Sequence, residues 1–329
     1  MKVSVVIATY RRAGSLGRTL GTIAAQHRQP EEVIVIDQSP PHEREAIAAN
    51  IANEARKGLN IRTIWSDKPS STHARNLGLA ASGGEWVIFS DDDVDWPPEL
   101  TGNLIAKVDA MPGLVMAAAR DTVASSQVQP CWRRIISALL LTNTFLPLRR
   151  GKVLACMQAR YPRPVIGDAE TEWAMGYWFA VDRRFVQGEG ITFDEKLTRY
   201  AQAEDMLFSN RIYQAAVREG KRCVLSQGLA VAHLVSKEWR EPDSFADLCD
   251  AWNRIYIAGQ LRPGWRFFLS LIAIHVAAIH KILVRVFRRG SWVGPLRAHL
   301  IALRHLGDIR AGRFRGLYEK YEKPSGRGS

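Results

Sequence analysis

Short apolar runs alternate with amphipathic stretches along the first 120 residues of the chain. Residues 3–8 are continuously apolar, which is typical of a strand buried on both faces. Further strands are expected over residues 32–37, 60–65, 85–90 and 114–119, and helices over residues 16–26, 42–56, 72–81 and 98–109. This alternation predicts an α/β fold, with a mostly parallel mixed sheet flanked by helices on both faces.

The rest of the chain shows two further patterns. The α/β pattern would be completed by a strand at 176–181, a helix at 204–217 and strands at 222–225 and 229–234. An uncharged stretch at 135–148 favours a core or packing helix over a membrane contact. Beyond about Pro242 the sequence is helical in pattern. We therefore expect one domain over residues 1–240, with halves at 1–120 and 121–240, and a helical extension over 241–329.

The charge of the chain is concentrated in this extension. The whole sequence carries a formal net charge of +12. Residues 254–329 contain 15 Lys and Arg against Asp308, Glu319 and Glu322, so the tail accounts for the whole excess. A neutral body with a basic tail indicates an anionic partner surface, either a membrane or a nucleic acid.

One run in the tail has the character of a membrane-surface helix. Residues 267–280 contain no charged side chain, but Arg266 and Lys281 bound them, so the run is shorter than the roughly 18–20 apolar residues of a spanning helix. Lys281, Arg285 and Arg288 share one helical face. An apolar body with a basic face resembles an interfacial helix on an anionic membrane surface. The alternative is a helix packed on the first domain or on a dimer partner.

Cysteine usage and the N-terminus indicate a cytoplasmic protein. The four cysteines are far apart and form no CxxC pair, so neither a disulfide scaffold nor a zinc cluster is expected. Residues 3–8 are too short for the apolar region of a signal peptide, and two arginines follow them. Together with the basic tail, these features predict a peripheral protein at the inner face of the plasma membrane.

Three consecutive aspartates, Asp91, Asp92 and Asp93, follow directly after the expected strand at 85–90. Their mutual repulsion would be relieved by a divalent cation, and their oxygen ligands favour Mg²⁺, Mn²⁺ or Ca²⁺. The alternative is a solvated acidic loop, or a helix start that Asp95 caps. Ligands of parallel sheets bind beyond the carboxyl ends of the strands.

Six short segments follow one another in a characteristic order. They are residues 3–11 (VSVVIATYR), 33–39 (VIVIDQS), 74–79 (ARNLGL), 89–93 (FSDDD), 193–197 (FDEKL) and 203–205 (AED). In this order the chain resembles glycosyltransferase family 2, the inverting, metal-dependent nucleotide-sugar transferases with the GT-A fold. The resemblance covers roughly residues 1–235, and the combination of motifs carries it. It implies that the domain at 1–240 is catalytic, with a nucleotide-sugar half followed by an acceptor half.

The resemblance implies where the nucleotide binds. Thr9, Tyr10 and Arg11 would line its pocket, at the end of the first strand. Asp37 would accept hydrogen bonds from the base or the ribose. Gln38 stands where the family usually has a second acid, which leaves the base preference open.

The resemblance also implies a site for Mn²⁺ or Mg²⁺ at the aspartate triplet. Asp92 or Asp93 would contact the metal, and Asp91 would contact the ribose or Arg75; a single sequence leaves open which of the three aspartates binds the ion. Arg75 itself would contact the diphosphate or hold the acidic cluster in place. His233 lies about where many members have a histidine near the metal, although a lone histidine at a strand end is also commonly structural.

The catalytic base implied by the resemblance is Asp205, in a pair with Glu204. The alternative for this pair is an acidic helix N-terminus stabilised by the macrodipole, and both can hold at once. On the acceptor side, Trp178 would bind substrate by stacking on a sugar ring, as would Trp173. Either tryptophan could instead belong to the core.

These roles imply transfer of a sugar from a nucleotide-diphosphate donor to a carbohydrate or lipid-linked acceptor, as in bacterial polysaccharide or glycolipid assembly. One alternative is a sugar-phosphate nucleotidyltransferase, but residues 8–12 lack the glycines of its basic loop. Another is a non-catalytic protein that binds membrane or nucleic acid through its tail. The intact acids argue against this, and we expect no nucleic-acid partner because no RNA-binding or helix-turn-helix motif is present.

Overall fold

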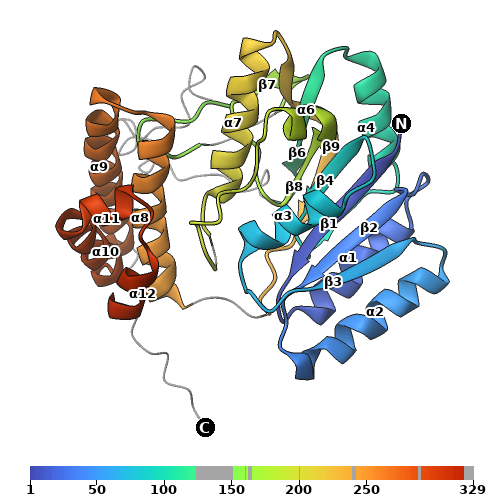
Figure 1. Ribbon diagram of the computed structural model, residues 1–329, viewed down its shortest axis with the longest axis horizontal. Helices are drawn as coiled ribbons and strands as arrows, with labels where there is room; N and C mark the ends of the chain where they lie inside the picture. The colour runs from blue at the N-terminus through green and yellow to red at the C-terminus, as the bar shows by residue number, and fades with distance from the viewer. Residues whose placement is uncertain are drawn as a thin grey trace. The chain divides into compact units, whose positions relative to one another are not determined.

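The computed structural model describes residues 1–123, 151–159, 161, 165–199, 201–238, 242–287 and 290–321. The chain forms two compact units, coloured along the sequence in Figure 1. The first contains residues 1–127, 161–199 and 205–239, and the second contains residues 128–160, 200–204 and 240–329. The uncharged stretch at 135–148 and Arg288 lie outside the described residues.

The first unit is built on a mixed sheet. The strands among its described residues are β1 (Val3–Thr9), β2 (Glu32–Asp37), β3 (Ile61–Trp65), β4 (Trp86–Ser90), β5 (Val94–Asp95), β6 (Leu114–Asp121), β7 (Ala169–Glu170), β8 (Trp178–Asp182) and β9 (Arg222–His233). Their order is β3-β2-β1-β4-β8-β6-β9-β5, and β7 pairs with β9. The pairs among β1 to β4 are parallel, whereas β8 is antiparallel to both β4 and β6.

Helices cover this sheet as the alternating pattern predicts (Figure 1). They are α1 (Ala13–Ala24), α2 (Arg44–Arg56), α3 (Ser71–Ala81), α4 (Leu100–Ala110), α6 (Arg183–Gly188) and α7 (Glu204–Arg218), with a 3₁₀ turn at Pro41–Glu43. The expected mixed α/β sheet flanked by helices is thereby confirmed. Two short strands and α6 were not predicted, and one bulged strand, β9, replaces two expected strands.

The region after the aspartates does not form the helix cap that was considered. Asp95 lies in β5 and pairs with Arg18 at 2.5 Å. Helix α4 begins only at Leu100, with no side-chain cap. The acidic loop is therefore drawn into the sheet by β5, which pairs with the end of β9.

Close packing against the sheet places α3 beside the strand ends. A Cβ atom on Gly78 would lie 2.2 Å from Cγ1 of Val6, so only glycine allows the helix to approach β1 this closely. Arg75 lies three residues earlier on the same helix and is buried. The approach of α3 thus brings a buried cation to the carboxyl ends of the strands.

The second unit is helical, as expected for the end of the chain. Its described helices are α8 (Asp243–Leu261), α9 (Trp265–Phe287), α10 (Val293–Arg304), α11 (Leu306–Arg310) and α12 (Arg315–Tyr321). Helix α8 packs against α9, α10 and α11. Trp252 of α8 is fully buried and stacks on Tyr318, with ring centroids 5.2 Å apart.

The expected basic face of α9 is directed at α8. Lys281 donates to Asp247 and Asp250, each at 3.0 Å, and Arg285 donates to Asp247 at 2.8 Å. Burial alone would raise the pKa of Asp250, but Arg254 and Lys281 hold it well below its usual value. This corrects the interpretation of Lys281 and Arg285 as a face for anionic lipid, because both cations neutralise buried acids inside the helical unit.

Helix α9 is longer than its uncharged run. It spans 23 residues, and an 18-residue window within it is apolar and long enough to cross a bilayer by composition alone. Only 33% of that window is buried in the unit. The uncharged run therefore underestimated the apolar length, although core helices of soluble proteins can pass the same test.

Candidate active site

The predicted residues meet at the carboxyl ends of β1, β2 and β4. Thr9 closes β1, Asp37 closes β2, and the aspartate triplet follows β4. The hydroxyl of Thr9 donates to Oδ2 of Asp92 at 2.7 Å, across the β1–β4 pair. The parallel register explains this meeting, because both strands end at the same edge of the sheet.

Two of the three aspartates and a distant histidine form a cluster. Asp91, Asp93 and His233 each offer a ligand atom, and these atoms lie within 4.8 Å of one another. His233 ends β9, and the β5–β9 pairing sets it opposite Val94, beside the triplet. The two carboxylates are suitable ligands for Mn²⁺ and Mg²⁺.

The Asp93 carboxylate is arranged to bind a cation. Its Oδ2 accepts from the backbone N–H of Ser236 at 2.7 Å. Its Oδ1 is buried without a hydrogen bond and lies 3.3 Å from Nε2 of His233. A buried carboxylate oxygen that lacks a donor is costly, so this oxygen fits a metal ligand. The residues present therefore fit a divalent ion.

The charges of this cluster stabilise one another. Burial alone would raise the pKa of Asp93, but His233, Ser236 and Arg12 lower it below its ordinary value. Burial would lower the pKa of His233, but Asp93 and Asp91 raise it. Asp93 is thus held as an anion, the form that binds a metal.

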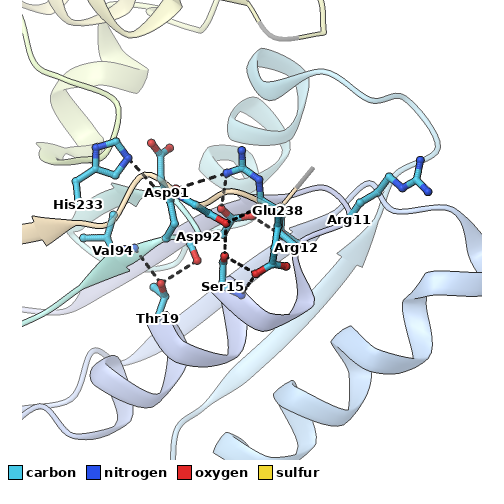
Figure 2. A network of polar contacts seen from close by, with 12 residues as sticks. Arg11, Arg12, Ser15, Thr19, Asp91, Asp92, Val94, His233 and Glu238 are labelled. Atoms are coloured by element: carbon cyan, nitrogen blue, oxygen red, sulfur yellow. Dashed lines mark hydrogen bonds and ion pairs between the residues drawn. The ribbon is translucent and has the colours of Figure 1, made fainter. Parts of the chain in front are cut away.

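Asp92 lies apart from this cluster. It is buried, and its carboxylate accepts from the Thr9 hydroxyl. It also accepts from Arg12 at 3.1 Å, as Figure 2 shows. Burial raises its pKa to about 7, although Arg12 and Thr9 lower it. The structure brings Asp91, rather than the expected Asp92, together with Asp93 and His233.

Of the two arginines after β1, the second faces the site. Arg12 was not predicted, and it lies 3.1 Å from Asp92 and 3.7 Å from Asp93. Arg11, which was expected in the nucleotide pocket, pairs with Glu43 and points away from the acidic cluster in Figure 2. Its backbone has a φ of 58°, which turns the chain between the two side chains. The adjacent Arg11-Arg12 pair was the available signal in the sequence.

Arg75 holds Asp91, as one of the two predicted roles requires. Its Nη2 donates to Oδ1 of Asp91 at 2.8 Å and to the carbonyl of Gly176 at 3.2 Å. The guanidinium is buried and also lies 5.5 Å from the Phe193 ring centroid. A charge-assisted hydrogen bond from a buried arginine is strong and fixes the geometry of its partner.

Asp205 lies on the other side of Gly176, in the first turn of α7. Its Oδ2 accepts from the N–H of Gly176 at 2.6 Å, and its Oδ1 accepts from the N–H of Met206 at 2.7 Å. Burial raises its pKa, and Arg75 opposes this rise. Glu204 is half-buried, and its N–H donates to the carbonyl of Ala201.

Gly176 leaves no room for a side chain between these two groups. A Cβ atom there would lie 3.1 Å from Nη2 of Arg75 and 3.2 Å from Oδ2 of Asp205. We therefore expect Gly176→Ala to lower the free energy of unfolding by about 1–3 kcal/mol, because the Arg75 guanidinium and the Asp205 carboxylate must both shift. Chemical denaturation would measure this. An unchanged midpoint would show that Arg75 and Asp205 move freely.

Two of the residues predicted for the nucleotide pocket, Asp37 and Tyr10, lie near the ends of β2 and β1. Asp37 is fully buried, and its Oδ1 accepts from the N–H of Ser39 at 2.7 Å. Its Oδ2 has no hydrogen-bond partner among the described residues, which suits a ligand donor. Gln38 donates its amide to the Ser70 carbonyl at 3.0 Å, so it braces the loop before α3. Tyr10, which directly follows β1, is half-buried.

Both tryptophans expected on the acceptor side belong to the core. Trp178 is 0% exposed and packs edge-on against Trp96, with centroids 5.8 Å apart. Trp173 is also buried and lies 4.7 Å from the Tyr161 ring. Stacking of Trp178 on a sugar is therefore corrected to core packing, because strand β8 is central in the sheet and has neighbours on both sides.

The sequence is similar to that of known glycosyltransferases. Residues 4–155 match the sequence model of "Glycosyl transferase family 2". The succinoglycan biosynthesis protein ExoO of Rhizobium meliloti is 23% identical over 98% of this chain and 89% of its own. An undecaprenyl-phosphate 4-deoxy-4-formamido-L-arabinose transferase of Salmonella choleraesuis is 27% identical over 50% of each chain.

The fold has counterparts among solved structures. The mannosyltransferase PcManGT from Pyrobaculum calidifontis, in complex with GDP-Man and Mn²⁺, matches with a TM-score of 0.55 at 17% identity, over 97% of this chain and 88% of its own. At this identity the match supports the GT-A fold alone. The family match over residues 4–155 and the GT-A fold make this chain similar to the glycosyltransferases of glycosyl transferase family 2.

Proposed function

We propose that this enzyme transfers a sugar from a nucleoside-diphosphate donor to a hydroxyl group by inverting single displacement. One observation carries the proposal. The Arg75 guanidinium donates to Asp91 of the acidic cluster and lies beside Gly176, whose N–H is bonded to Asp205. A leaving-group site and a proton acceptor are therefore neighbours, as a displacement requires.

Asp205 is the proposed base. Its carboxylate removes the proton of the acceptor hydroxyl as that oxygen attacks the anomeric carbon, while the bond to the diphosphate breaks on the opposite side. The raised pKa of Asp205 makes it a better proton acceptor than an ordinary aspartate. The N–H groups of Gly176 and Met206 hold its two oxygens in place.

Asp91, Asp93 and His233 are the proposed ligands of Mn²⁺ or Mg²⁺. Asp92 lies next to them and contacts Thr9 and Arg12 instead. The ion, when bound, would offset the charge that develops on the diphosphate leaving group. Oδ1 of Asp93, which accepts no hydrogen bond among the described residues and lies beside Nε2 of His233, supports this assignment. The free Oδ2 of Asp37 supports a hydrogen bond to the base or ribose of the nucleotide.

The names of two relatives support a proposal for the acceptor class. One relative is named for succinoglycan biosynthesis and another for transfer to undecaprenyl phosphate. We infer a carbohydrate or lipid-linked acceptor in bacterial polysaccharide or glycolipid assembly. A panel of UDP-, GDP- and dTDP-sugars, assayed for Mn²⁺-dependent thermal stabilisation and hydrolysis, tests the reaction class. If no donor is hydrolysed or stabilises the protein in the presence of Mn²⁺ or Mg²⁺, the proposed reaction class is wrong.

A lipid-linked acceptor would require contact with a membrane, and the helical unit has a suitable surface. One stripe of α9 exposes large apolar side chains at helical spacing: Trp265, Phe268, Leu269, Ile272, Ile279 and Leu283. Helix α10 exposes Val293, Leu296, Leu300 and Leu303 in the same way. The exposed Arg266 and Arg304 on these helices could meet anionic headgroups.

We propose that α9 and α10 lie on the inner face of the plasma membrane of the cell. The opposite side of α9 supports a surface position rather than a spanning one, because Lys281 and Arg285 are bound to acids of α8. A spanning α9 would have to carry these ion pairs into hydrocarbon, at high cost.

Substitution of exposed apolar residues on α9 and α10 by charged residues should release the protein from membranes. We expect the Ile272→Asp/Leu300→Asp double variant to sediment with anionic vesicles at least tenfold less than the parent chain, because charged groups oppose insertion of an apolar face. Val217→Asp is the control, since Val217 is an exposed valine on α7. Undiminished sedimentation of the double variant would contradict the membrane proposal, and a change of oligomeric state would indicate a dimer surface.

A further inference from the structure

The segment after β9 turns back onto the acidic cluster. The N–H of Leu234 donates to the carbonyl of Asp93 at 3.0 Å, and the N–H of Ser236 donates to its Oδ2 at 2.7 Å. Between them, Val235 has a φ of 55°, which is a rare conformation for a β-branched residue. Such strain persists only where surrounding contacts enforce it. Something must therefore hold this turn against Asp93.

The far end of the same segment is fixed to the start of α1. Oε1 of Glu238 accepts from the N–H of Ser15 at 2.8 Å and from its hydroxyl at 2.7 Å. The Ser15 and Ser236 hydroxyls also lie 2.8 Å apart. Helix α1 has no side-chain cap of its own, so Glu238 supplies one from 223 residues away. An anion at a helix N-terminus is favourable.

Helix α1 holds the aspartate loop as well. The hydroxyl of Thr19 donates to the carbonyl of Asp92 at 2.9 Å and accepts from the N–H of Val94 at 3.0 Å. Figure 2 shows these bonds and the Ser15–Glu238 bonds on the same helix. Helix α1 is thus one support for two segments that meet at Asp93, namely the loop at 91–95 and the segment at 234–238.

We propose that Glu238 is a positioning residue of the metal site. By binding Ser15, it keeps Ser236 against Oδ2 of Asp93, which leaves Oδ1 free and beside His233. Without Glu238 the strained turn at Val235 relaxes. The Asp93 carboxylate then rotates, or it accepts a hydrogen bond from water in place of the one from Ser236. The inference rests on the proposed metal-dependent transfer. Partners that orient a metal ligand typically alter metal affinity by about 10- to 100-fold.

This role is tested by titrating the full chain with Mn²⁺ in the absence of donor and measuring Mn²⁺ binding by electron paramagnetic resonance. Glu238→Ala should weaken Mn²⁺ binding about tenfold. Glu238→Gln keeps an oxygen that accepts from Ser15 and should retain most of the affinity. Glu219→Ala, an exposed glutamate after α7, should bind Mn²⁺ as the parent does. Melting temperatures measured in parallel separate positioning from a general loss of stability.

The outcomes distinguish this inference from the function on which it rests. If the parent chain binds no Mn²⁺, the proposed metal site is wrong and the inference falls with it. If the parent binds Mn²⁺ and Glu238→Ala binds it equally well, only the role of Glu238 is wrong. Equal weakening by Glu238→Ala and Glu238→Gln would also overturn it, because the hydrogen-bond acceptor would not be what matters.

Discussion

Replacing Asp205 with asparagine is expected to abolish sugar transfer while donor binding survives. Asparagine keeps the shape of the side chain, and its carbonyl oxygen can still accept from one of the N–H groups of Gly176 and Met206. It cannot take a proton from the acceptor. The loss of a general base costs about 10² to 10⁴-fold in rate, so kcat should fall by that factor. Calorimetric titration of the donor should show an unchanged affinity.

The assignment of Asp205 as the base also predicts the direction in which activity changes with pH. The pKa of Asp205 lies above its ordinary value because the carboxylate is buried. Since the base acts in its ionised form, kcat/KM should rise with pH and be lost as pH falls through this raised pKa. This rise of kcat/KM with pH should be absent from the residual activity of the Asp205→Asn variant. Glu204→Gln serves as a control in the neighbouring acid and should cost much less. Near-normal transfer by Asp205→Asn would show that the base lies elsewhere.

The second large effect is expected at Asp93. Asp93→Asn removes the charged oxygen that lies beside His233, so Mn²⁺ affinity should fall at least 100-fold and transfer should be lost with it. Equilibrium binding of Mn²⁺ measures this directly.

The adjacent Asp92 is a matched control for Asp93. Asp92→Asn alters the same functional group one residue away, but its carboxylate contacts Thr9 and Arg12. We expect Asp92→Asn to weaken Mn²⁺ binding far less than Asp93→Asn. An equal loss in the two variants would restore Asp92 as a ligand, which is what the resemblance alone implied.

The order of strands and helices could be predicted because local patterning and buried apolar runs determine it. The strand at 32–37 coincides with β2, and the meeting of Thr9 with the triplet follows from parallel strands ending at one edge. The family motifs also indicated Arg75 beside Asp91. These features depend on residues close in sequence or on a regular sheet.

The choice among three adjacent aspartates depends on contacts that a single sequence does not contain. Arg12 and Thr9 donate hydrogen bonds to the Asp92 carboxylate, and the pairing of the two-residue strand β5 with β9 places His233 beside Asp93. The three aspartates lie in the turn between β4 and β5, and this turn places Asp91 and Asp93 beside His233 while Asp92 faces Thr9 and Arg12. The same limit applies to Trp178, whose burial follows from the antiparallel insertion of β8 between β4 and β6.

The basic tail shows a different limit. Net charge indicated an anionic partner, but it could not tell exposed cations from those that neutralise buried acids. Asp247 and Asp250 lie before the counted tail, and they bind Lys281, Arg285 and Arg254 inside the helical unit. What remains exposed on α9 is chiefly apolar. The membrane proposal therefore depends on that apolar stripe more than on the charge.

Single displacement at Asp205 is tested most directly by the anomeric configuration of the sugar first released from the donor. Proton NMR during Mn²⁺-dependent hydrolysis of the donor selected from the panel would record it before mutarotation. We predict that the released sugar has the opposite configuration to the donor, and that Asp205→Asn does not produce it. Release with the donor's own configuration would contradict the proposed mechanism.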